Sequence, residues 1–311
     1  MTVAQRVLAA WDRFLFEPQQ TSTLAILRIA FGLTVTVWTL CQLPTLFTFY
    51  AQDGVLPTAP ALGPGAWGLL QTTSGSTLVA VVWLALLVGA VALTVGLQSR
   101  IAAVVVFLGL LSLERRNPFI LNSGDILLRN MAFVLVFAPT GVALSVDRWR
   151  AHRSTFWEFP ARAPWALRML QIQLSVIYVS AAWFKLQGDQ WRGGTAVTWA
   201  LGIEDITRVP APSFLTDSAV LTEMFTFGTI ALELSLAILV WKRAARPWVL
   251  GLGVLMHVGI DLAFMVGFFS VAMLCLYLVF VPPDVATTRL LALRERASTR
   301  RGLVTSREAS D

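Results

Sequence analysis

Residues 171–199 read QIQLSVIYVSAAWFKLQGDQWRGGTAVTW, a run that begins apolar enough for lipid and turns polar after a lone lysine, Lys185. If this segment is helical, spacings of three and four residues place one set of side chains on a single stripe: Gln171, Ser175, Tyr178, Ala182 and Lys185. The stripe carries an amide, two hydroxyls and an amine. Within a membrane, such groups face a partner helix or a water-filled cavity rather than lipid. We therefore expect the rest of the chain to pack around this face.

The composition indicates an all-α, polytopic membrane helix bundle. Hydrophobic residues make up 56% of the 311 residues, charged residues 14%, and the mean hydropathy is +0.70, whereas a soluble domain carries about a quarter charged residues. Runs of about 20 apolar residues recur along the chain. They predict about eight transmembrane helices, at residues 24–43, 77–97, 101–113, 127–144, 165–186, 220–241, 247–266 and 268–281.

Three parts follow from this pattern. Residues 1–23 predict an interfacial helix that lies on the bilayer, residues 24–284 a single transmembrane domain, and residues 285–311 a basic cytoplasmic tail. The net charge of +6 comes from cations in alternate loops, with a bias of roughly three to one, so both termini should be cytoplasmic and nucleic acid is not an expected partner. Arg28, near the start of the first span, is expected to snorkel to the cytoplasmic interface.

Six cations break this bias and fall in the predicted outer segments: Arg115, Arg116, Arg129, Lys185, Arg192 and Arg208. Because they lie at and beyond helix ends on one side of the membrane, we expect them to converge on one outward-facing polar site. The arginine pair at 115 and 116 is either an interface anchor or a site for an anionic group.

Lys185 has two interpretations. An ammonium next to apolar surroundings is more easily deprotonated, which can create a base. The alternative is a lysine that snorkels at a helix end and pairs with Asp189, one turn further on.

Three more ionisable residues fall inside predicted spans. His257 and Asp261 are four residues apart, so the carboxylate could orient the imidazole, and Glu233 lies near the middle of its span. The alternative is a polar contact between helices that only fixes packing. The chain has two histidines and neither a CxxC nor an HExxH motif, so no metal site is expected.

The sequence NSGD at residues 122–125 is typical of a turn or a helix N-cap, with Asp125 at the start of the fourth span. A structural role for this turn does not prevent Asn122 from also facing a site. The basic, aromatic stretch at residues 148–168 predicts an amphipathic segment on anionic lipid.

Four segments carry a resemblance to a known family: RNPFILNSGDILLRN (116–130), ALSVDRWR (143–150), RMLQIQLSVIYVSAAWFKLQGDQWRGGTAV (168–197) and, more weakly, MHVGIDLAFMVGFFSVAML (256–274). They resemble bacterial HTTM (horizontally transferred transmembrane domain) proteins, a superfamily that includes vitamin K-dependent γ-glutamyl carboxylase. The most distinctive block has a lysine-leucine pair followed by an acid, a tryptophan and a glycine. The resemblance implies a multi-pass protein of the bacterial plasma membrane.

In the carboxylase, the lysine of that block is the base that deprotonates vitamin K hydroquinone, so the resemblance assigns this role to Lys185. His257 lies where the carboxylase has a histidine. The carboxylase has another histidine in the segment that aligns with Asn122 and Ser123, and a large C-terminal lumenal domain, and neither is found in this sequence. The family also includes a bacterial membrane protein needed for the maturation of a secreted peptide toxin.

Two hypotheses follow. The first is an enzyme that acts on a reduced quinone or a similar lipid-soluble acid, with Lys185 as base and His257, oriented by Asp261, assisting. Its expected substrate-binding residues are Arg115, Arg116, Asn122, Asp125, Tyr178, Trp191 and Glu233. The second is a non-catalytic membrane protein that binds lipid or assists the maturation or export of a secreted peptide. In both, the lipid bilayer is the immediate partner.

Overall fold

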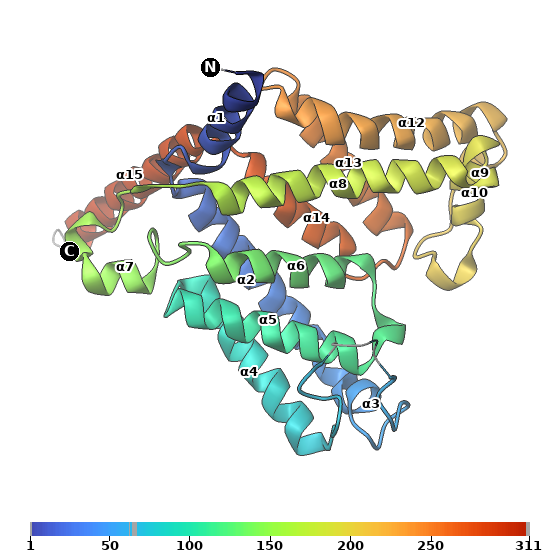
Figure 1. Ribbon diagram of the computed structural model, residues 1–311, viewed down its shortest axis with the longest axis horizontal. Helices are drawn as coiled ribbons and strands as arrows, with labels where there is room; N and C mark the ends of the chain where they lie inside the picture. The colour runs from blue at the N-terminus through green and yellow to red at the C-terminus, as the bar shows by residue number, and fades with distance from the viewer. Residues whose placement is uncertain (1, 62, 64–66, 309–311) are drawn as a thin grey trace.

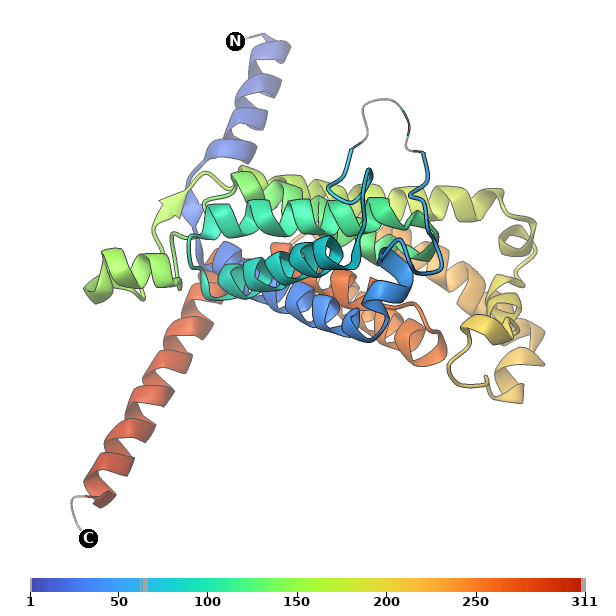
Figure 2. The ribbon, with the colours of Figure 1, turned by 90° about the horizontal axis from the view of Figure 1, so that it is seen from below.

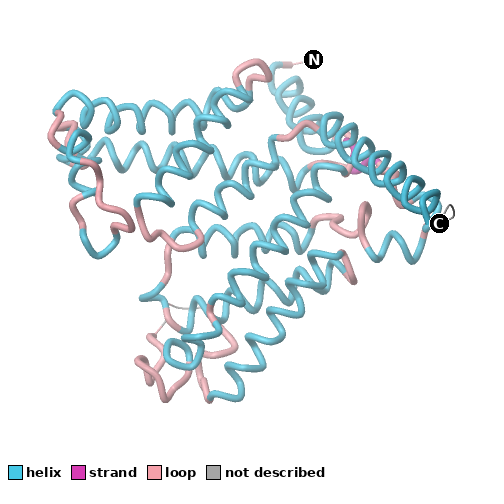
Figure 3. Tube along the Cα trace, turned by 180° about the vertical axis from the view of Figure 1, so that it is seen from behind, coloured by secondary structure: helices cyan, strands magenta, loops and turns pink. Residues whose placement is uncertain are grey.

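A computed structural model describes residues 2–61, 63 and 67–308, and these residues are mostly helical (Figures 1 and 3). Short helices lie between the long ones: α3 (Leu46–Tyr50), α7 (Val146–Ala151), α9 (Asp189–Arg192), α10 (Ala196–Leu201) and α11 (Ser213–Thr216). The body of the protein consists of α2 (Ser22–Cys41), α4 (Ser76–Val95), α5 (Ser99–Arg116), α6 (Ser123–Phe137), α8 (Trp165–Gln187), α12 (Ala219–Ile238), α13 (Arg246–Ala263) and α14 (Phe269–Tyr277).

Local sequence explains where the helices begin and end. The side chain of Asn122 accepts hydrogen bonds from the backbone of Gly124 and Asp125, and Asp125 bonds back to the Asn122 amide, so the predicted N-cap of α6 is confirmed. The prediction that this helix continues to residue 144 is wrong, because it ends at Phe137. Pro139 disfavours the helical conformation of the residue before it, Ala138, which is extended.

The long helices pack in two groups around one core. In the first, α4 contacts α2 and α5, and α5 contacts α6; in the second, α8 contacts α12, and α13 contacts α12 and α14. Helix α14 also contacts α2 and α6, so it joins the groups (Figure 1). The buried core between them is built from leucine, phenylalanine and small residues, including Leu27, Phe31, Leu110, Leu128 and Leu174.

Four helical stretches among the described residues are long and apolar enough to cross a membrane: Ser22–Tyr50, Ser76–Val95, Trp165–Gln187 and Ala219–Trp241. A fifth results if Phe269–Phe280 and Pro283–Arg296, which meet at 102°, count as one broken span. The other helices are shorter or more polar; α6, for example, has 15 residues, against the about 20 that a span needs.

The two terminal helices are both attached at one end of the bundle. Helix α1 (Val3–Phe16) and helix α15 (Pro283–Glu308) leave that end in opposite directions, across the long helices (Figure 2). Between them, the Ser22 hydroxyl donates to the Pro283 carbonyl at 2.8 Å and the Thr23 hydroxyl to the Val281 carbonyl at 2.9 Å. These two hydrogen bonds hold the start of α2 against the start of α15.

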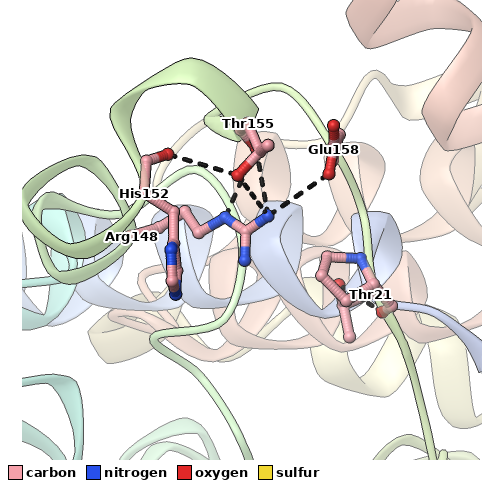
Figure 4. Close-up of polar contacts among 6 residues, drawn as sticks. Thr21, Arg148, His152, Thr155 and Glu158 are labelled. Carbon is pink, nitrogen blue, oxygen red and sulfur yellow. Dashed lines mark hydrogen bonds and ion pairs between the residues drawn. The ribbon is translucent and has the colours of Figure 1, made fainter.

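The basic stretch at residues 148–168 folds back on itself beside this junction (Figure 4). The Arg148 guanidinium donates to the Thr155 hydroxyl at 2.8 Å and lies 3.6 Å from the Glu158 carboxylate. The Thr21 hydroxyl donates to the Pro160 carbonyl at 3.0 Å. The strands β1 (Gln19–Gln20) and β2 (Ala161–Arg162) then pair in antiparallel fashion next to α15 (Figure 3).

Arg28 does not snorkel, so that expectation was wrong. Its side chain is fully buried and donates to the carbonyls of Thr140 and Leu144, at 2.9 Å and 2.6 Å. The turn after α6, in which Leu144 has a positive φ of 46°, presents these carbonyls to the guanidinium. Carbonyl hydrogen bonds replace the water that a charged group otherwise needs.

Asp147 completes this junction outside the long helices. Its carboxylate accepts hydrogen bonds from the Gln98 amide at 2.7 Å and from the amide and hydroxyl of Ser99, both at 3.0 Å. Partial burial raises the pKa of Asp147, but these hydrogen bonds and the charge of Arg28 together outweigh it and hold the pKa below its ordinary value. Asp147 therefore caps α5 as an anion.

Candidate functional site

The polar stripe of α8 faces other helices of the bundle. Near its start, the Gln171 amide donates to the Val279 carbonyl at 2.6 Å, and the Ser175 hydroxyl donates to the Ala237 carbonyl at 2.8 Å. The Trp241 indole donates to the same hydroxyl at 2.9 Å. Tyr178 and Ala182 are buried further along. The stripe thus links α8 with α12 and with the turn that follows α14.

At the end of the stripe, Lys185 forms an ion pair with Glu233 of α12. The Lys185 Nζ lies 2.5 Å from the Glu233 Oε1, and 5.0 Å from the centroid of the Trp191 ring, over which it packs. The carboxyl side chain is only 7% exposed and the lysine side chain 22%. The alternative pairing with Asp189 is not found, because Asp189 pairs with Arg192 on the surface instead.

Two turns before Lys185, three aromatic residues form a buried hydrogen-bonded group. The Tyr178 hydroxyl lies 2.9 Å from the His257 Nε2 and also bonds the Tyr277 hydroxyl. His257 comes from α13 and is 1% exposed, and Tyr277 ends α14. The site therefore joins three helices that are far apart in the sequence.

His257 is oriented by Tyr178 rather than by Asp261. The His257 Nδ1 is buried without a hydrogen-bond partner, and Asp261 has no hydrogen bond or ion pair with the described residues. Four-residue spacing on a helix allows a contact but does not require one. Tyr277 was not among the expected residues. The only signal for it was that a tyrosine hydroxyl inside an apolar run needs a polar partner.

Glu233 has a second buried oxygen besides the one that pairs with Lys185. This oxygen, Oε2, has no hydrogen-bond partner among the residues that the structure describes. An unpaired carboxylate oxygen and an unpaired imidazole nitrogen are costly inside a protein unless something else pairs with them. These two atoms are available for a proton or for a polar group of a ligand.

An apolar cavity of about 510 Å³ lies between α12 and α13. Its lining includes Leu232, Met256, Ile260 and Phe264, and the first two are the sequence neighbours of Glu233 and His257. Apolar cavities of this size with a few polar groups nearby are typical of small-molecule sites.

The other expected site residues do not converge on this centre. The Arg116 guanidinium is fully buried and donates to the carbonyls of Leu56 and Ala51, while Arg115 donates to the Trp67 carbonyl. Both arginines thus hold the segment after α3. In the part of the chain that the structure describes, no hydrogen bond or ion pair joins them to Lys185.

Asn122 and Asp125 form a separate polar group. Besides capping α6, the Asp125 carboxylate accepts a hydrogen bond from the Trp38 indole at 2.8 Å. Arg129, one turn further on, pairs at 2.6 Å with Glu114, which is 1% exposed. The described residues include no cluster of His, Cys, Asp and Glu that could hold a metal ion.

Comparison with curated proteins and with solved structures gave no match. The family model described as the HTTM domain, however, matches residues 16–285, a range that contains α2, α8, α12, α13 and α14 and with them every residue of the site described above. The matched range covers most of the chain. The described residues include four helices, or five if the bent pair counts as one span, that are long and apolar enough to cross a membrane. This chain is therefore a membrane protein of the HTTM-domain family.

Proposed function

We propose that eight helices cross the membrane, with both termini in the cytoplasm of a bacterial cell. Helices α5, α6, α13 and α14 do not qualify by length and composition alone, but each packs against a helix that does, or against another of the four. The bias of the basic residues toward one side supports this orientation. The amphipathic helix α1, with Val3, Leu8 and Trp11 exposed, then lies on the cytoplasmic face.

We further propose that the protein is an enzyme that deprotonates a lipid-soluble acid such as a reduced quinone. The observation that carries this proposal is the mostly buried ion pair of Lys185 and Glu233, together with an apolar cavity whose lining includes Leu232, the sequence neighbour of Glu233. A polar group that is expensive to bury is rarely kept inside a membrane protein without a function. A hydroquinone matches the cavity because it joins an apolar ring to an acidic hydroxyl.

In this mechanism the ion pair accepts one proton. When the proton of the pair rests on the Glu233 carboxyl group, Lys185 is a neutral amine and takes the proton of the substrate hydroxyl. The pair then consists of a carboxylic acid and an ammonium, and the ammonium faces the substrate oxyanion. Trp191 covers the amine and limits the access of water. His257 and Tyr178 position a second polar atom of the substrate, because no described residue pairs with the His257 Nδ1.

The test is turnover by the purified protein. Reduced quinone and oxygen should yield an epoxide or another oxidised product, and the Lys185→Ala variant should reduce the rate to background. Arg192→Ala removes a nearby exposed cation and should retain the rate. If the wild type is no faster than Lys185→Ala, the enzymatic proposal is wrong.

A second candidate is a non-catalytic protein that assists the maturation or export of a secreted peptide. Three expected substrate-binding residues support this candidate, because their polar atoms make structural contacts instead. Asn122 caps a helix, and Arg115 and Arg116 hold a loop. Under this proposal Lys185→Arg, which keeps the charge but does not readily deprotonate, retains activity in cells. Loss of activity in this variant at normal expression would contradict it.

A further inference from the structure

A second cavity, which is polar, lies at the opposite end of α8 from Lys185, near the hydrogen bonds between the start of α2 and the start of α15. It measures about 220 Å³, and three arginines line it: Arg168 of α8, and Arg243 and Arg246 near the start of α13. Gln171 and the Asp284 carboxylate also line it. One water occupies about 30 Å³ of liquid, so this space of about 220 Å³ holds a group larger than a few water molecules.

The three arginines are held close together although they repel one another. The charge of Arg246 acts on Arg168, and the charge of Arg243 acts on Arg246. Arg168 is fixed by its hydrogen bonds to the Phe14 carbonyl at 3.1 Å and to the Gln171 amide oxygen at 2.9 Å. Arg246 is fixed by a 2.8 Å bond to the Val240 carbonyl.

The charge balance of this cavity favours an anion. Arg243 is exposed and takes part in no ion pair or hydrogen bond with the described residues, so its guanidinium is free to bind a ligand. Asp284 opposes one of the three positive charges, which leaves two. A phosphate group matches that excess, and arginines bind it through several hydrogen bonds at once.

An apolar groove of about 410 Å³ adjoins the cavity beneath the interfacial helix α1. Trp11 and Phe14 of α1 and Ile172 of α8 line it, and Trp241 lines both the groove and the polar cavity. Arg168 connects the two as well, because it packs 4.8 Å from the centre of the Phe14 ring. A phosphate site next to an apolar groove matches the headgroup and the acyl chain of one molecule.

We propose that this place is a binding site for an anionic phospholipid, with the headgroup phosphate on Arg168, Arg243 and Arg246 and an acyl chain under α1. Basic pockets between helices on the cytoplasmic side are suited to such headgroups. The site is independent of the proposed chemistry at Lys185, and its occupant fixes α1 on the bundle.

The experiment measures binding of phosphatidic acid to the purified protein in phosphatidylcholine nanodiscs by native mass spectrometry. Arg243→Gln should weaken binding about fivefold, the effect of one surface cation on an anionic lipid, and Arg243→Glu more strongly. The matched control is Lys242→Gln, which removes the neighbouring exposed charge outside the cavity and should leave binding within about twofold, because that ammonium does not line the site. Equal effects of Arg243→Gln and Lys242→Gln, or no effect of either, would overturn the proposal.

A second arm separates a lipid from a free anion. Trp11→Ala should weaken binding of phosphatidic acid but not of inorganic phosphate, while Trp248→Ala, which removes an exposed tryptophan outside the groove, should change neither. Inorganic phosphate that binds as tightly as the lipid would show a free-anion site and would overturn the lipid assignment.

Discussion

Lys185 and Glu233 are 48 residues apart in the sequence, yet their charged atoms lie 2.5 Å from each other, one on α8 and the other on α12. The pair is mostly buried, while the pair of Asp189 and Arg192, four residues further along the chain, is exposed. The chain therefore offers two ion pairs that are close in the sequence, one buried and one exposed, whose contributions to stability can be compared.

Removing one member of the buried pair should destabilise the protein strongly. Breaking such a pair costs about 3–5 kcal/mol, because the remaining charge is left uncompensated. Lys185 retains some exposure, so we expect Glu233→Gln to lower the free energy of unfolding in detergent by about 3 kcal/mol. Arg192→Gln should cost less than about 1 kcal/mol.

The double variant Lys185→Met/Glu233→Gln separates stability from activity. It removes both charges, so its melting temperature should return toward that of the wild type while turnover stays absent. A double variant as unstable as Glu233→Gln would show that an uncompensated buried charge is not the cause of the loss of stability.

Tyr178→Phe should affect the aromatic group more than Tyr277→Phe does. The first change removes the hydroxyl that bonds both the His257 Nε2 and Tyr277, and leaves a buried imidazole without a partner. Such a loss costs about 1–3 kcal/mol. The second change keeps the bond between Tyr178 and His257, so its melting temperature should lie between those of the wild type and Tyr178→Phe. Equal melting temperatures for the two variants would contradict this order.

Asp147 should make stability depend on pH in the acidic range. Because its pKa in the folded protein is below its ordinary value of about 3.9, its contribution is fully present above that value and is lost as pH falls through the folded pKa. We expect Asp147→Asn to melt at a lower temperature than the wild type at pH 7, and the difference to shrink below about pH 4. A difference that stays constant down to strongly acidic pH would show that the carboxylate charge is not responsible.

Gly96 and Gly251 form a matched pair for testing the turn at Arg28. Gly96 has a positive φ of 73°, and a Cβ there would meet Ser145 and the Arg28 guanidinium. Gly96→Ala should therefore lower the free energy of unfolding by at least ~2 kcal/mol. Gly251 lies in α13, and a Cβ there would meet no described atom within 4 Å. Gly251→Ala should therefore be neutral or stabilising by up to about 1 kcal/mol. Thermal unfolding of the two variants decides between these outcomes.

Features that depend on neighbouring residues could be predicted from the sequence. The inward face of α8 follows from spacings of three and four residues, and the cap at Asn122 follows from side-chain chemistry within four residues. The end of α6 was also locally encoded in Pro139, but the apolar run that continues to Leu144 obscured it.

Features that depend on distant partners could not be predicted in this way. One of the two interpretations of Lys185 paired it with Asp189, the nearest acid in the sequence, because nothing local indicates which residue of α12 lies opposite α8. The partner of His257 is a tyrosine 79 residues earlier rather than the acid one turn away. Arg28 was assigned to the interface because its carbonyl acceptors are more than a hundred residues away.

The hydrogen bonds from Ser22 to Pro283 and from Thr23 to Val281 have a consequence for biogenesis. The first apolar helix leaves the ribosome some 260 residues before the carbonyls that its hydroxyls need. During synthesis, these two hydrogen bonds form only after residues 281 and 283 have left the ribosome, so the start of α2 reaches its final contacts late. A chain that stops before residue 281 would lack both acceptors, and the start of α2 would lose the hydrogen bonds that hold it to the end of the bundle.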